Sequence, residues 1–163
     1  MTTTELYTRF QHSTGVSTDT RSLREGQMFF ALKGSSFNGN AYAKQALDSG
    51  AAFVVVDEKQ YAATGDARYL LVKDSLKALQ DLANYHRQQL GTTILGLTGS
   101  NGKTTTKELI KLVFESDRRI FVTPGNFNNH IGLPLSLVQL QPAHEFAVLE
   151  MGDNQPGDIR ELC

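Results

Sequence analysis

The sequence predicts an α/β fold in two parts: a small N-terminal mixed α/β domain over residues 1–90, then the first part of a parallel α/β domain over residues 91–163. Short apolar runs that suit buried strands alternate with helical patterns along the chain, which is typical of parallel sheets. A glycine-rich segment at residues 98–106 joins an apolar run directly to a helical pattern. Gly91 interrupts a long helical pattern, so we place the boundary between the two parts near residues 88–92.

The elements of the first part follow from apolar spacing and turn residues. Residues 3–12 predict a short helix because Leu6 and Phe10 share one face. The remaining elements are, in order, an extended segment at 16–21, a strand at 27–32, a loop at 34–40, a helix at 41–49 ended by Gly50, a strand at 52–56, a loop at 57–68, a strand at 69–72, and a helix capped by Asp74 or Ser75 that runs to about residue 90.

The second part predicts a parallel sheet with crossover helices. Its strands are expected at 93–97, 120–122 and 146–150, and its helices at 107–114, at 135–140 with Pro134 as first residue, and from 156 onward. We expect the strand at 120–122 to lie beside the strand at 93–97. Because the last helix and the sheet are unfinished, we expect the sequence to be a fragment of a longer protein.

Composition excludes several classes of protein. The net charge is −1 with no run of basic residues, so we expect neither nucleic acid nor an anionic membrane as a partner. No apolar run has transmembrane length, and the N-terminus does not resemble a signal peptide. The single cysteine, Cys163, has no internal partner. We therefore expect a cytoplasmic protein. A monomer is expected separately, although the sequence leaves the oligomeric state open.

The segment Thr98–Thr106 has the chemistry of a phosphate-binding loop. Glycines let the backbone turn tightly, and the free N–H groups at the start of the next helix attract anions. Lys103 supplies a charge for the phosphates of ATP, and the Thr104 hydroxyl suits Mg²⁺. The residues expected to bind ATP are Gly99, Ser100, Asn101, Gly102, Lys103, Thr104 and Thr105.

The spacing of this loop departs from the standard pattern. That pattern has glycine at the position of Leu97, whereas here Gly99 stands three residues before Gly102. The loop is therefore a shorter variant. The alternative is an ordinary glycine-rich turn with Lys103 in solvent.

Two further segments are expected near the phosphates. Residues 125–134 hold three asparagines, Asn126, Asn128 and Asn129, whose amides both donate and accept hydrogen bonds. Glu150 ends an apolar strand, where its carboxylate suits Mg²⁺. The alternatives are a turn that uses asparagine for its backbone conformation, and a glutamate that faces solvent.

Two segments of the first part offer polar groups to a ligand. They are Asp19-Thr20-Arg21 and the loop at 33–40, which contains Asn38 and Gly39. Each suits an anionic or sugar ligand. Taken alone, each also suits a simple turn.

Together these segments resemble the Mur ligases of peptidoglycan synthesis. The resemblance rests on Thr98–Thr106, Asp19-Thr20-Arg21, Gly26–Phe30, Ala31–Gly34, Asn38-Gly39, Gly50-Ala51, Gly125–Asn129, Ile131–Pro134, Glu150–Gly152 with Asn154, and Pro156–Ile159. It covers nearly the whole chain. The family's central domain continues well beyond residue 163.

The resemblance implies an ATP-dependent amide ligase that adds D-alanyl-D-alanine to UDP-N-acetylmuramoyl-tripeptide through an acyl phosphate. It implies that residues 1–90 hold the UDP-sugar and that residues 91–163 are part of a P-loop-type ATPase domain. Lys103 and Glu150 would be catalytic, and Thr104 and Glu150 would hold Mg²⁺. The substrate would contact Thr20, Arg21, Asn38, Gly39, Asn126, Asn128 and Asn129.

Other functions remain open at this point. One is the neighbouring ligase that adds the third residue of the peptide, and another is a non-catalytic module that binds a UDP-sugar. A switch-type nucleotide hydrolase needs Asp-x-x-Gly and Asn-Lys-x-Asp, which the sequence lacks. We expect no turnover from these 163 residues alone.

Overall fold

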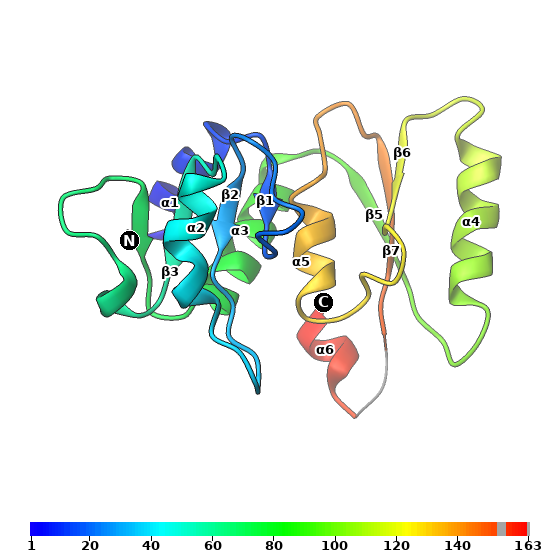
Figure 1. The fold of residues 1–163 in the computed structure, drawn as a ribbon. Coiled ribbons are helices and arrows are strands. Elements are labelled where there is room, and N and C mark those ends of the chain that lie inside the picture. The colour runs from blue at the N-terminus through cyan, green and yellow to red at the C-terminus, as the bar shows by residue number, and fades with distance from the viewer. Residues whose placement is uncertain (153–155, 163) are drawn as a thin grey trace. The chain divides into compact units, whose positions relative to one another are not determined.

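The computed structural model describes residues 1–152 and 156–162. The chain divides into two compact units, Met1–Tyr85 and His86–Cys163, each with its own parallel sheet (Figure 1). The division falls inside one helix, α3 (Ser75–Gln89). The boundary near residues 88–92 stays a prediction.

The first unit is built on a sheet with strand order β1-β2-β3-β4, and every neighbouring pair is parallel. The strands are β1 (Val16–Ser17), β2 (Met28–Phe30), β3 (Phe53–Val56) and β4 (Tyr69–Leu71). The helices are α1 (Thr3–Gln11), α2 (Ala43–Asp48) and α3, with short 3-10 turns η1 (Gly39–Tyr42) and η2 (Lys59–Tyr61). The predicted order of helices and strands is confirmed for this unit.

Both faces of this sheet are buried because its central strands are apolar throughout. Side chains alternate along a strand, so Phe29 and Val54 point to one face and Met28 and Val55 to the other, and all four are buried. The first face packs on α2 through a cluster of small and branched side chains. Helix α1 buries Leu6 and Phe10, as predicted.

The second unit has a three-stranded parallel sheet with strand order β5-β7-β6. Its strands are β5 (Thr93–Leu97), β6 (Ile120–Val122) and β7 (Phe146–Glu150). Figure 1 shows α4 (Lys103–Phe114) on one face and α5 (Gly132–Leu137) with α6 (Asp158–Leu162) on the other. Leu133 of α5 and Leu149 of β7 form the core of that second face.

Two predictions for this unit are wrong. Strand β6 does not lie beside β5, because the later strand β7 is inserted between them and pairs with both. The helix expected to begin at Pro134 begins at Gly132. Its start is fixed by the Asn129 side chain, whose Oδ1 accepts hydrogen bonds from the N–H groups of Ile131 and Gly132 at 3.0 and 2.8 Å. Pro134 fits the first turn because N–H groups there have no helical partner.

Within the described residues, none of the helices α1 to α6 is both long enough and apolar enough to cross a membrane.

Candidate functional site

The loop between β5 and α4 places the predicted phosphate-binding residues at the carboxyl end of a strand and the start of a helix. Gly102 is the N-cap of α4 and has a left-handed backbone, with φ +77°, which glycine adopts without strain. The first helical hydrogen bond runs from the Thr106 N–H to the Gly102 carbonyl at 2.8 Å. The Lys103 ammonium folds back and donates to the Gly99 carbonyl, so its charge lies over the loop.

Glu150 lies at the end of β7, and its carboxylate is buried beside this loop. The Thr104 hydroxyl donates to its Oε2 at 3.2 Å, and the Asn128 amide donates to its Oε1 at 3.0 Å. Three predicted site residues from three segments therefore meet at one carboxylate. A glutamate that faces solvent, the simpler alternative, does not fit a side chain that is 3% exposed.

The oxygen atoms of Thr104 and Glu150 fit a divalent cation. Magnesium binds hard oxygen ligands at 2.0–2.1 Å in an octahedron, which places neighbouring ligands about 3 Å apart. The Thr104 Oγ1 and Glu150 Oε2 atoms are 3.2 Å apart. The two atoms are therefore spaced as two ligands of one magnesium ion would be.

The other two asparagines of the loop have different surroundings. The Asn129 side chain accepts the N–H groups of Ile131 and Gly132 at the start of α5, and the carbonyl of Asn126 accepts a hydrogen bond from the Asn128 N–H at 2.8 Å. The loop is thus a shaped turn that presents Asn128 to Glu150. Asn154 and the neighbouring Asp153 lie outside the described residues.

Sequence reasoning missed Lys107, a fully buried lysine in the second turn of α4. Its ammonium donates to the Thr123 carbonyl at 2.9 Å and lies 3.8 Å from Glu150 Oε2. Thr123 is also buried, and its hydroxyl accepts the Glu150 backbone N–H at 2.8 Å. The available signal was helical spacing, because Lys107 is three residues after Thr104 and shares its face.

In the first unit, Asn38 and Gly39 belong to a buried polar network. Its centre is Asn40, which is fully buried and whose amide nitrogen donates to Asn38 Oδ1 at 2.9 Å and to Asp57 Oδ1 at 2.8 Å. The Asn38 amide in turn donates to Glu58 at 3.0 Å. The Gly39 N–H donates to the Leu32 carbonyl at 2.9 Å. These contacts hold the loop at 33–40 against the ends of β2 and β3.

The segment Asp19-Thr20-Arg21 is organised by an ion pair. The Arg21 guanidinium donates hydrogen bonds to both carboxylate oxygens of Asp19, and the Arg21 backbone N–H donates to the same carboxylate. Together these hydrogen bonds lower the pKa of Asp19 to about 2. The Arg21 side chain is otherwise exposed. Its charge is therefore accessible to a ligand, while Thr20 is half-buried beside it.

Asp57 gives the network of the first unit a pH dependence. Burial works to raise its pKa, but hydrogen bonds from the Asn40 amide, the Ser75 N–H and the Lys33 ammonium outweigh burial, so the pKa lies below its usual value. A carboxylate whose pKa is lowered by folding stabilises the folded protein fully at pH values above its unfolded-state pKa of about 3.9. This stabilisation is lost as the pH falls through the folded-state pKa.

We therefore expect the difference in unfolding free energy between the wild type and Asp57→Asn to be constant near neutral pH and to shrink below about pH 4. The measurement is urea unfolding of both proteins over a series of pH values. A difference that stays constant down to pH 2 would contradict this assignment.

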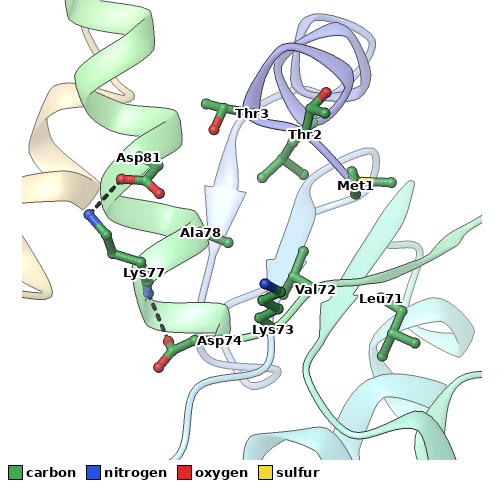
Figure 2. Close-up of a pocket in the computed structure, with 11 residues that line it drawn as sticks. Met1, Thr2, Thr3, Leu71, Val72, Lys73, Asp74, Lys77, Ala78 and Asp81 are labelled. Atoms are coloured by element: carbon green, nitrogen blue, oxygen red, sulfur yellow. Dashed lines mark hydrogen bonds and ion pairs between the residues drawn. The ribbon is translucent and has the colours of Figure 1, made fainter.

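A cavity of 540 Å³ lies elsewhere in the first unit, between α1, the end of β4 and the start of α3 (Figure 2). The predicted substrate residues do not line it. Both helix starts beside it are already capped: Thr2 accepts the Glu5 N–H in α1, and Asp74 accepts the Lys77 N–H in α3. We therefore do not place the site there.

Each of the two units contains a region that matches a family of known proteins. Residues 97–163 match the family model of the Mur ligase middle domain, and residues 12–87 match that of the Mur ligase family, catalytic domain. The chain is 47% identical over 145 residues to the UDP-N-acetylmuramoyl-tripeptide–D-alanyl-D-alanine ligase of Bacillus subtilis, which covers 89% of this chain. The chain belongs to the Mur ligase family.

Solved structures of Mur ligases have the same fold. The MurF ligase from Thermotoga maritima in complex with ADP matches 91% of this chain and 34% of its own, with a TM-score of 0.80 and 38% identity. A UDP-N-acetylmuramoyl-L-alanyl-D-glutamate–2,6-diaminopimelate ligase matches 86% of this chain and 32% of its own, with a TM-score of 0.51 and 25% identity. The first of these is clearly more similar to this chain.

The chain is much shorter than the Mur ligases that it matches. It spans 32% of the length of the Bacillus subtilis relative. Residues 97–163, which match the Mur ligase middle domain, contain the segment Thr98–Thr106, the asparagine-containing loop at 125–134 and Glu150.

Proposed function

We propose that the chain forms about a third of an ATP-dependent amide ligase that adds D-alanyl-D-alanine to UDP-N-acetylmuramoyl-tripeptide. The observation that carries the proposal is the meeting of Thr104, Asn128 and Glu150 beside the loop of Lys103. The similarity to D-alanyl-D-alanine ligases over 89% of the chain supports the choice of reaction.

ATP is the nucleotide in this proposal. The loop residues 99–105 and the start of α4 would hold its phosphates through backbone N–H groups and the Lys103 ammonium. The relative from Thermotoga maritima was solved in complex with ADP, which supports an adenine nucleotide as the ligand. Thr104 and Glu150 would hold Mg²⁺, which supplies positive charge to the phosphates when bound.

In the proposed reaction the terminal carboxylate of the tripeptide attacks the γ-phosphorus of ATP, giving an acyl phosphate and ADP. The amine of D-alanyl-D-alanine then attacks the acyl carbon, loses a proton and releases phosphate. Lys103 and the loop N–H groups would stabilise the charge that develops on the phosphoryl oxygens. Asn128 would keep the Glu150 carboxylate in place throughout.

We propose that residues 1–90 bind the UDP-sugar and that residues 91–163 are part of the ATP-binding domain. The exposed Arg21 guanidinium, which is oriented by Asp19, would contact the diphosphate. Asn38 and Gly39, whose polar groups are held by Glu58 and Leu32, would shape the substrate loop. Thr20, Asn126 and Asn129 complete the proposed substrate set.

The neighbouring ligase that adds the third residue is the second candidate. Its solved structure matches this chain with a TM-score of 0.51, against 0.80 for the D-alanyl-D-alanine ligase, which favours the latter. A non-catalytic module that binds a UDP-sugar is the third candidate. It would bind the UDP-sugar substrate without binding ADP.

Titration calorimetry of the chain tests the proposal. We expect ADP with Mg²⁺ to bind, and Thr104→Val to weaken that binding by about tenfold, or about 1.4 kcal/mol, because the variant removes a hydroxyl that would hold the metal ion. Thr106→Val, which changes an exposed hydroxyl two residues further along α4, is the matched control. Binding of UDP-N-acetylmuramoyl-tripeptide without any binding of ADP would favour the sugar-binding module.

A further inference from the structure

The proposed function assigns no role to Lys107, a buried lysine of the second unit. Its side chain is 1% exposed, and a buried ammonium is costly unless opposite charge and hydrogen-bond acceptors surround it. The acceptors are the carbonyls of Thr123 and Gly125, at 2.9 and 3.4 Å. These carbonyls lie just before and at the start of the asparagine loop, residues 125–134.

Two carboxylates face the Lys107 ammonium. Glu108 Oε1 lies at 3.4 Å but its side chain is 52% exposed, so water screens its charge. Glu150 Oε2 lies at 3.8 Å and its side chain is 4% exposed. The buried charge that balances Lys107 is therefore that of Glu150.

The other contacts of the Glu150 carboxylate are neutral. Thr104 donates a hydroxyl and Asn128 an amide, and neither brings a positive charge. Lys103, the other cation at the loop, donates to the Gly99 carbonyl. In the described part of the chain, Lys107 thus supplies the positive charge within 4 Å of this buried carboxylate.

We propose that Lys107 is the internal counter-ion of Glu150 and balances its charge when no metal ion is bound. Because Lys107 lies beside the same oxygen that accepts from Thr104, its charge also opposes a cation at that oxygen. Lys107 is then a positioning residue that sets how strongly the site holds its metal. This second consequence rests on the proposed function, whereas the ion pair itself does not.

A double-mutant cycle on the metal-free protein tests the ion pair. Lys107→Met, Glu150→Gln and the double variant are compared by urea unfolding in the presence of a chelator. Removing Lys107 alone leaves a buried carboxylate unpaired, so the double variant should be more stable than the sum of the single changes predicts, by about tenfold in the unfolding constant.

Lys111→Met, one helical turn further along α4, is the matched control and should combine additively with Glu150→Gln. If Lys107→Met does not fold, Lys107→Gln takes its place, because its amide retains a hydrogen-bond donor. An additive cycle for Lys107 and Glu150 would overturn the inference.

The second measurement is the gain in ADP affinity that Mg²⁺ produces, determined for the wild type and Lys107→Gln. Loss of the opposing charge should increase this gain by about tenfold. A merely structural function for Lys107 would lower the affinity equally with and without the metal, and an unchanged or smaller gain would overturn the inference. If the wild type bound no ADP, the proposed function would fail, while the metal-free cycle would still decide the ion pair.

Discussion

Replacing Lys103 by alanine should weaken the binding of ATP to the chain by about tenfold or more. A charge-assisted hydrogen bond to a phosphate is worth about 1.5–3 kcal/mol, and 1.4 kcal/mol corresponds to a factor of ten. The ammonium already lies over the phosphate-binding loop, where it donates to the Gly99 carbonyl. Isothermal titration calorimetry measures the effect.

The matched control for this prediction is Lys111→Ala. Lys111 lies two turns further along α4, so its loss removes the same charge from the same helix at a greater distance from the loop. We expect ATP affinity to change little in this variant. Equal affinities of Lys103→Ala and the wild type would remove Lys103 from the proposed site.

Replacing Gly39 by alanine should lower the free energy of unfolding of the first unit by about 1–3 kcal/mol, the usual effect of forcing an extra carbon into a packed interior. A Cβ at this position would lie 2.8 Å from the Leu32 nitrogen and 2.9 Å from the Ala31 carbonyl carbon. Both atoms belong to backbone at the end of the sheet and cannot move aside. Chemical denaturation followed by circular dichroism measures the loss.

Gly34→Ala is the matched control in the same loop. A Cβ there would meet only the ring of Phe37, at 2.7 Å from its Cδ1 atom, and that ring is 57% exposed and free to turn away. We expect a much smaller loss of stability than for Gly39→Ala. Similar losses in the two variants would show that the approach to the backbone is not the cause.

The local pattern of the sequence was sufficient to predict most helices and strands. Apolar runs such as Phe53–Val56 have few alternatives, because they must be buried and are too short for helices. The glycine turn before α4 could also be predicted from local residues, since Gly102 and the start of the helix form one continuous segment.

The order of strands could not be predicted in the same way. The sequence places β6 before β7, yet β7 lies between β5 and β6. Pairing between strands depends on how apolar faces pack across the whole sheet. The order of strands therefore cannot be inferred from residues that are neighbours in the sequence. The same placement brings Glu150 to the centre of the sheet edge.

By itself the sequence determined most helices and strands and the resemblance to the Mur ligases, and it predicted a loop for phosphates with a threonine and a glutamate suited to a cation. Only the tertiary structure decided which of these groups meet. Glu150 contacts Thr104 and Asn128 across 46 and 22 residues of chain, and the buried Lys107 is its nearest cation. The physical reason is that burial and electrostatic pairing are properties of the packed sheet. Helical spacing places Lys107 on the same face as Thr104, but it does not show that the lysine will be enclosed.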